Sequence, residues 1–242
     1  MKYVAVIPSI YQPYTDACVA SCKLDNVHVV DNTHVNSGVA ASWNVGVREM
    51  YRADADWCVI VSAGVRFGDA GGRDLLDLMD ANPGLLCVDG ANLGWHLRAM
   101  NRRIFDEVGL FDENIWPAYC EDTDWTHRCN LAFDFDWHFD PVYWIRPEID
   151  ATLEQTSHGV NLAKVETNGM GQREYYVRKW GGDTNGWGSG GNGKTEWPHP
   201  FNNPANDHRY WPDPVHGARI GQSPPEGGER CSWDWIDQFK GH

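Results

Sequence analysis

The sequence has no run of about 20 apolar residues, the length that a helix needs to cross a bilayer. The apolar run at its start, Met1 to Ile7, is too short for a signal peptide, and Pro8 ends it. The seven cysteines include no C-x-x-C pair, so we expect reduced thiols rather than a disulfide framework. Cys18 and Cys22 lie on an expected helix and are interpreted as buried apolar residues. Together these absences predict a cytoplasmic protein.

Positive charge is scarce, because 20 Lys and Arg residues stand against 34 Asp and Glu residues and give a net charge of −14. Non-specific binding to nucleic acid needs a surface rich in Lys and Arg, and so does binding to an anionic membrane surface. The composition therefore disfavours nucleic acid as a partner, although the net charge does not reveal whether a local basic groove exists. No membrane partner is expected.

Apolar runs and helical patterns alternate over the first part of the chain. Strands are expected at residues 3–8, 27–30, 57–61 and 85–88, and helices at 13–22, 39–52 and 74–81. A helix, a turn and a second helix are expected over 101–134, and a further strand at 142–145. This order is typical of an α/β fold, a Rossmann-like, mostly parallel sheet flanked by helices.

Polar or small residues follow three of the expected strands, as Pro8-Ser9, Asp31-Asn32 and Ser62-Ala63-Gly64. They are candidates for a binding site, because ligands of such sheets bind beyond the carboxyl ends of the strands. Asp31 suits a uracil imide or a ribose hydroxyl, but it equally suits an Asx turn. Asn36 to Gly38 begin a helix whose free N–H groups favour phosphate, although simple capping also explains them. Asn44, on the same helix, faces either the ligand or solvent.

The composition changes near Gly181. Gly181 to Gly193 contains seven glycines, and Pro198 to Pro214 contains five prolines. We predict one domain over residues 1–182 and a loop-rich extension over 183–242 that packs on it. The expected anchors of this extension are Trp197, Trp211, Trp233 and Trp235.

Four stretches of the chain resemble the family 2 glycosyltransferases, which have the GT-A fold. They are Val29 to Asn32 with Asn36 to Gly46, Arg102 to Glu113, Tyr119 to Trp125 with its Glu-Asp pair, and His158 with Lys179-Trp180-Gly181-Gly182. The resemblance covers about residues 3–182 and lies in the order and spacing of these stretches.

The resemblance implies an inverting transfer of a hexose or pentose from a nucleotide-sugar, foremost a UDP-sugar, to an acceptor hydroxyl. It implies that Asp122 is the general base and that Glu121 helps to hold the acceptor. The implied donor residues are Pro8, Ser9, Asp31, Asn32, Asn36, Gly38, Asn44, Ser62, Ala63, Gly64 and His158, and the acceptor residues are Trp116 and Tyr119. Taken without the resemblance, Glu121 and Asp122 are also expected as charges at a helix start, and Asp124 with Arg128 as a surface ion pair.

The chain departs from the family where an Asp-x-Asp or Asn-x-Asp usually holds a divalent cation on the donor diphosphate. Ser62-Ala63-Gly64 stands there, with Gly64 in place of the last Asp, and Asp69 is a poor substitute. A hard cation needs oxygen ligands at fixed geometry, so the metal is left open. The alternatives are catalysis without metal, loss of activity, or neutralisation of the diphosphate by Arg66, His158, Lys164 and Arg173.

Other functions fit parts of the pattern. A nucleotidyltransferase of the same fold would need a Gly-rich, basic loop after the first strand, and Ser9 to Gln12 is not such a loop. A catalytically inactive protein that binds a nucleotide-sugar or a carbohydrate agrees with Gly64 but not with the Glu121-Asp122 pair. The acceptor stays open among proteins, glycans, lipids and a hydroxymethylated DNA base.

Overall fold

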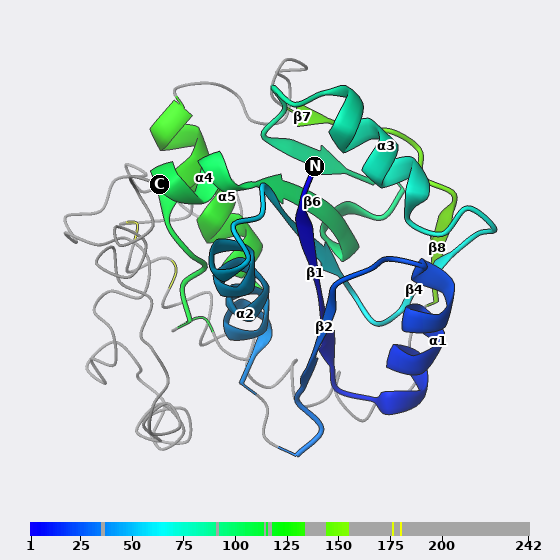
Figure 1. The fold of residues 1–242 in the computed structure, drawn as a ribbon. Helices are drawn as coiled ribbons and strands as arrows, with labels where there is room; N and C mark the ends of the chain where they lie inside the picture. Colours follow the sequence, from blue (N-terminus) through cyan, green and yellow to red (C-terminus); the bar gives the residue numbers. More distant parts are fainter. Residues whose placement is uncertain are drawn as a thin grey trace. The chain divides into compact units, whose positions relative to one another are not determined.

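The computed structural model describes residues 1–34, 37–90, 92–113, 115, 118–133, 144–154, 176 and 180 (Figure 1). They belong to two compact units. The first comprises Met1–Ser37, Ser42–Glu107 and Phe133–Ser157, and the second includes Gly38–Ala41, Val108–Ala132, Tyr176 and Trp180. The extension expected at 183–242, and with it the boundary at 182, lies outside the described residues.

The first unit contains a six-stranded sheet with the strand order β2-β1-β3-β6-β5-β7. Its strands are β1 (Tyr3–Ser9), β2 (Val27–Asp31), β3 (Trp57–Val61), β5 (Cys87–Asp89), β6 (Leu97–Asn101) and β7 (Trp144–Ile145). β1 is parallel to β2 and β3, and β5 is parallel to β7, whereas β6 is antiparallel to β3 and β5. A separate antiparallel pair consists of β4 (Val65–Phe67) and β8 (Ala151–Leu153). The expected α/β fold is confirmed.

Strand β6 was not expected from the sequence, and its antiparallel pairing with β3 and β5 makes the sheet mixed. It follows a short 3-10 turn, η1 (Gly94–His96), and all of its residues are buried. Arg98 interrupts its apolar pattern, and this concealed the strand. The sheet tolerates the charge because Nη2 of Arg98 lies 2.8 Å from Oδ2 of buried Asp89 on β5.

The helices expected at 13–22 and 74–81 are found as α1 (Gln12–Cys22) and α3 (Arg73–Ala81), and both pack on one face of the sheet. Cys18 and Cys22 of α1 share an apolar cluster with Ile7 of β1. The prediction that these cysteines are buried apolar residues is confirmed. Burial raises the pKa of Cys18 to about 12, so its side chain stays a thiol at neutral pH.

Helix α2 (Val39–Arg52) packs on the opposite face, and its predicted range is confirmed. Gly46 lies so close to Val6 of β1 that a Cβ at Gly46 would be 2.5 Å from Cγ1 of Val6. Side chains alternate along a strand, so Val6 and Ile7 point to opposite faces and α2 lies across the sheet from α1. Figure 1 shows α1 and α2 on either side of β1.

The helix, turn and helix expected over 101–134 are found as α4 (Arg102–Val108) and α5 (Glu121–Phe133). In the second unit, α5 packs through Trp125, which is fully buried. Its ring stacks on that of Phe111 with the centroids 5.3 Å apart. No helix among the described residues is long and apolar enough to cross a membrane.

The ion pair between Asp124 and Arg128 on α5 is buried, so the prediction of a surface pair is wrong. The side chains are 0% and 3% exposed, and Nε of Arg128 lies 3.0 Å from Oδ2 of Asp124. Arg128 also donates hydrogen bonds to the carbonyl oxygens of Val108 and Leu110. Asp124 accepts a further hydrogen bond from Nε1 of Trp180 at 2.8 Å. The charges can be buried because these partners replace water.

Candidate functional site

The first unit has a topological switch between β1 and β3. The chain passes from β1 to neighbouring β2 through α1, and then crosses back through α2 to β3 on the other side of β1. The parallel strands β1, β2, β3 and β5 end at one edge of the sheet, where antiparallel β6 begins. This carboxyl edge is marked by Ser9, Asp31, Ser62, Asp89 and His96. Ligands of open α/β sheets bind beyond such an edge.

Asp31 lies at the carboxyl edge, as the sequence predicted, and is exposed. Its Oδ1 accepts hydrogen bonds from the backbone N of Thr33 at 2.8 Å and from Oγ1 of Thr33 at 2.6 Å. These hydrogen bonds hold the pKa of Asp31 below its ordinary value. The Asx turn is therefore present, and the Asp31 carboxylate is ionised at neutral pH. Its contact with a base or ribose stays a prediction.

Two of the implied donor residues have buried side chains that hold the edge together. Nδ2 of Asn32 donates to Oγ of Ser42 at 2.9 Å, and its Oδ1 accepts from the backbone N of Ser37 at 2.9 Å. Asn32 thereby joins the end of β2 to the start of α2. Oγ of Ser9 accepts a hydrogen bond from Oγ1 of Thr15 on α1 at 2.6 Å. Both side chains therefore form hydrogen bonds within the protein.

The remaining implied residues near α2 differ in their settings. Pro8 is half-buried and is in register with Val30 of β2. Gly38 has φ of 89°, a left-handed conformation that favours glycine before the helix. Asn44 is completely buried, so the alternative of a solvent-facing Asn44 is wrong. Asn36 lies outside the described residues.

The loop after β3 has no room for the missing carboxylate. A Cβ at Gly64 would lie 2.9 Å from the carbonyl oxygen of Glu154, whose backbone N donates to the oxygen of Gly64 at 2.8 Å. Oγ of Ser62 lies 3.1 Å from Nδ1 of His96, and Ala63 supplies no polar side chain. Across the described part of the chain no group of three His, Cys, Asp or Glu residues could hold a metal ion. Ser62, Ala63 and Gly64 themselves supply no carboxylate ligand for a divalent cation.

Arg66, the first candidate for neutralising a diphosphate, forms hydrogen bonds and an ion pair within the protein. Its Nη1 donates to the carbonyl oxygens of Ala63 at 2.8 Å and Tyr14 at 3.3 Å, and its Nη2 pairs with Glu154. Asp69 is exposed, and its backbone oxygen accepts from Nζ of Lys23. The other candidates lie outside the described residues: His158, Lys164 and Arg173.

The sequence did not predict a stack of two tryptophans and an arginine at the carboxyl edge, in which Trp43 and Arg98 are buried and Trp95 is half-buried. Trp43 of α2 stacks on Trp95 with ring centroids 5.5 Å apart, and the guanidinium of Arg98 lies 3.5 Å from the centroid of Trp95. Oδ2 of Asp89 binds both Arg98 and half-exposed Arg146, whose Nη2 is 3.1 Å away. The one available signal was the charge of Arg98 inside an apolar run. Two guanidinium groups thus share one carboxylate at this edge.

In the second unit, Glu121 and Asp122 begin α5 in different environments. Glu121 is 6% exposed, and its Oε2 is buried without a hydrogen-bond partner among the described residues. Burial, with a smaller contribution from the charge of Asp122, raises the pKa of Glu121 well above its ordinary value. Asp122 is half-buried, and its Oδ1 accepts from the backbone N of Thr123 at 2.7 Å. The carboxyl group of Glu121 is thus shielded from water, whereas that of Asp122 is partly accessible to water.

The turn before this pair is strained. Tyr119 and Cys120 have φ of 76° and 74°, which non-glycine residues adopt at a cost in energy. Tyr119 is 51% exposed, and its contact with the acceptor stays a prediction. Trp116, the other implied acceptor residue, lies outside the described residues.

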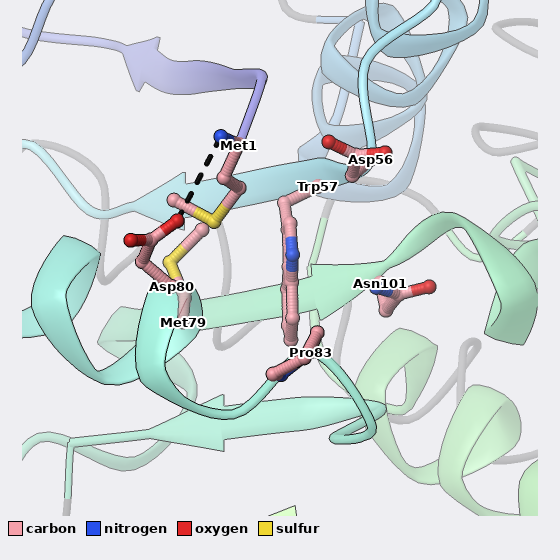
Figure 2. Close-up of a pocket in the computed structure, with 7 residues that line it drawn as sticks. All are labelled: Met1, Asp56, Trp57, Met79, Asp80, Pro83 and Asn101. Atoms are coloured by element: carbon pink, nitrogen blue, oxygen red, sulfur yellow. Dashed lines mark ion pairs between the residues drawn. The ribbon is translucent and has the colours of Figure 1, made fainter.

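A cavity of about 270 Å³ lies at the opposite edge of the sheet, where β1 and β3 begin (Figure 2). Its lining residues are Met1, Asp56, Trp57, Met79, Asp80, Pro83 and Asn101. The amino group of Met1 lies 3.7 Å from Oδ1 of Asp80. The two carboxylates in this lining would repel a diphosphate. The cavity is therefore a poor donor site, and the carboxyl edge is the better candidate.

No family model matches the sequence, and no curated protein matches it either. The fold is similar to that of the mannosyltransferase PcManGT from Pyrobaculum calidifontis in complex with GDP-Man and Mn2+, at 13% identity and a TM-score of 0.47. That match covers 73% of this chain and 61% of the mannosyltransferase.

Two further solved structures are similar in fold. S. aureus TarS 1-349 matches at 13% identity and a TM-score of 0.41, over 55% of this chain and 56% of TarS. A glycosyltransferase involved in the glycosylation of the major capsid of PBCV-1 matches at 10% identity and a TM-score of 0.35, over 60% and 82%. The chain thus spans less than two thirds of the first two proteins. These distant likenesses assign neither a donor nor an acceptor to this chain.

Proposed function

We propose that this chain is an inverting glycosyltransferase that moves a sugar from a nucleotide-sugar, foremost a UDP-sugar, to an acceptor hydroxyl. The switch point between β1 and β3 supports this most, because polar side chains gather at its carboxyl edge. Asp31 is exposed and ionised there, which suits a uracil N–H or the ribose hydroxyls. Ser62 and His96 add a hydroxyl and an imidazole at the end of β3.

In the proposed reaction Asp122 takes the proton of the acceptor hydroxyl as that oxygen attacks the anomeric carbon. The new bond joins the acceptor oxygen to the anomeric carbon. The bond between that carbon and the donor diphosphate breaks, and the nucleoside diphosphate leaves with the electron pair. Asp122 suits this role because it is half-buried and its backbone begins a helix anchored by Trp125.

We further propose that the transfer proceeds without a divalent cation. The contact between Gly64 and Glu154 supports this, because a side chain at position 64 would meet the carbonyl oxygen of Glu154. Side chains of the protein would then balance the charge of the diphosphate. Exposed His96 and half-exposed Arg146 are described groups at the carboxyl edge with the right chemistry.

Calorimetric titration with a panel of nucleoside diphosphates in EDTA tests the donor site. UDP should bind, and removal of the chelator should leave its affinity unchanged. Asp31→Asn should weaken UDP binding about tenfold through the loss of one charged hydrogen bond. Asp77→Asn, an exposed change on α3, is the matched control and should have no effect. Binding that vanishes in EDTA and returns with manganese would refute the metal-free proposal.

The second candidate function is an inactive protein that binds a nucleotide-sugar or a carbohydrate. The Ser62-Ala63-Gly64 loop favours it, since it lacks the acidic pair that resembling enzymes carry. Chromatographic measurement of UDP released from a panel of UDP-sugars separates the two functions. Binding without UDP release, with or without protein, glycan, lipid and hydroxymethylated DNA acceptors, would favour the inactive protein.

A further inference from the structure

Glu121 is a carboxyl group that the fold has removed from water without supplying a counter-charge. It is 6% exposed, and its Oε2 lacks a hydrogen-bond partner within the described part of the chain. On its own helix, Asp124 and Arg128 are bound to each other at 3.0 Å. The described charged group that acts on Glu121 is Asp122, which has the same sign. An ionised Glu121 would therefore be strongly disfavoured.

Two effects oppose burial. A backbone hydrogen bond lowers the pKa of Glu121, and Glu121 is the first residue of α5, where a helix N-terminus favours an anion. The helix N-terminus changes an ionisation equilibrium by up to about thirtyfold in a partly buried setting. Full burial of a carboxyl changes it by about a thousandfold or more. Burial is therefore the larger effect. It agrees with the raised pKa of Glu121, whose largest cause is desolvation.

The backbone directly before Glu121 has an unfavourable conformation. Tyr119 and Cys120, directly before Glu121, are both held at positive φ. Two successive non-glycine residues in this conformation are unfavourable unless the surroundings impose it. Directly after this turn, Glu121 is buried and its neighbour Asp122 is half-buried. Pairs of carboxyls whose environments separate their ionisation commonly divide the acid and base roles at one site.

We propose that Glu121 remains a neutral carboxylic acid and that it donates its O–H hydrogen bond to an oxygen of the bound acceptor. The neutral state follows from the fold alone, whereas the acceptor contact rests on the function proposed above. Glu121 then binds the acceptor and takes no proton. A neutral Glu121 also places no like charge beside Asp122.

Thermal unfolding as a function of pH tests the neutral state without any substrate. A carboxyl whose folded pKa lies above its unfolded value of about 4.3 stabilises the fold fully at low pH, and this stabilisation is lost as pH rises through the folded pKa. Glu121→Gln has the same shape and cannot ionise. Its Tm should exceed that of the unaltered protein by a margin that grows between about pH 5 and pH 8. Glu107→Gln, an exposed change on α4, is the control and should show no such margin.

A difference in Tm between Glu121→Gln and the unaltered protein that stays constant with pH would overturn the neutral state. So would an unaltered protein that gains stability relative to Glu121→Gln as pH rises.

Transfer kinetics test the acceptor contact. Glu121→Gln should raise the acceptor KM less than Glu121→Leu does, because its amide still donates a hydrogen bond. Glu121→Leu should raise the acceptor KM about tenfold and leave UDP binding intact.

Loss of turnover in Glu121→Gln as complete as that in Asp122→Asn would mean that Glu121 takes the proton, which contradicts the proposal. An unaltered protein without transfer activity would refute the proposed function together with the acceptor contact. The pH series would still decide the protonation of Glu121 in that case, so the two failures can be told apart.

Discussion

Removal of the positive charge from the buried ion pair of α5 should destabilise the protein strongly. Arg128→Met keeps most of the side-chain volume but leaves Asp124 as a buried charge, since both side chains are nearly inaccessible to water. Breaking such a pair on one side costs about 3–5 kcal/mol. The carbonyl oxygens of Val108 and Leu110 also lose a donor, which places the change at the upper part of this range.

Urea unfolding followed by tryptophan fluorescence measures this loss, and a thermal scan should show Tm lower by about 6–20 °C. The control is Arg103→Met, which removes an exposed arginine from α4 and should cost less than about 1 kcal/mol. The double variant Asp124→Asn with Arg128→Met should recover part of the loss. Asparagine removes the uncompensated charge and still offers an oxygen to Nε1 of Trp180.

The reasoning is refuted if Arg128→Met costs no more than Arg103→Met. It is also refuted if the double variant is less stable than Arg128→Met alone. Either result would mean that water solvates the pair. The outcome bears on the proposed active site because this ion pair lies on the helix that begins with Glu121 and Asp122.

Asp122→Asn should lower the transfer rate about 10²–10⁴-fold and leave UDP affinity unchanged in calorimetry, because asparagine cannot take a proton. Gly64→Asp should lower Tm and should not make UDP binding depend on manganese, since its Cβ would meet a backbone oxygen at 2.9 Å. Arg98→Met should destabilise the protein by about 3 kcal/mol or more in urea unfolding, because Asp89 is buried. Arg146→Gln, at a half-exposed position, should cost less than about 1 kcal/mol, and a larger cost would show that it anchors Asp89.

Local sequence patterns determined most of the α/β framework. The ranges of α1 and α2 follow from proline at a helix start and from apolar residues at helical spacing, both of which act over a few residues. The carboxyl-end position of Asp31 also follows from the sequence, because an apolar run that stops at a polar pair marks the end of a strand. The burial of Cys18 follows from the same helical spacing.

Tertiary structure alone decided which polar groups are buried and what each one contacts. β6 joins the sheet through hydrogen bonds to distant strands, and Arg98 is tolerated there because folding brings Asp89 beside it. The same holds for Arg128, whose carbonyl partners are 18 and 20 residues away in sequence. Glu121 and Asp122 are adjacent and chemically alike, so no sequence pattern could distinguish them. Their difference arises because burial depends on contacts between segments that are distant along the chain, which local spacing does not encode.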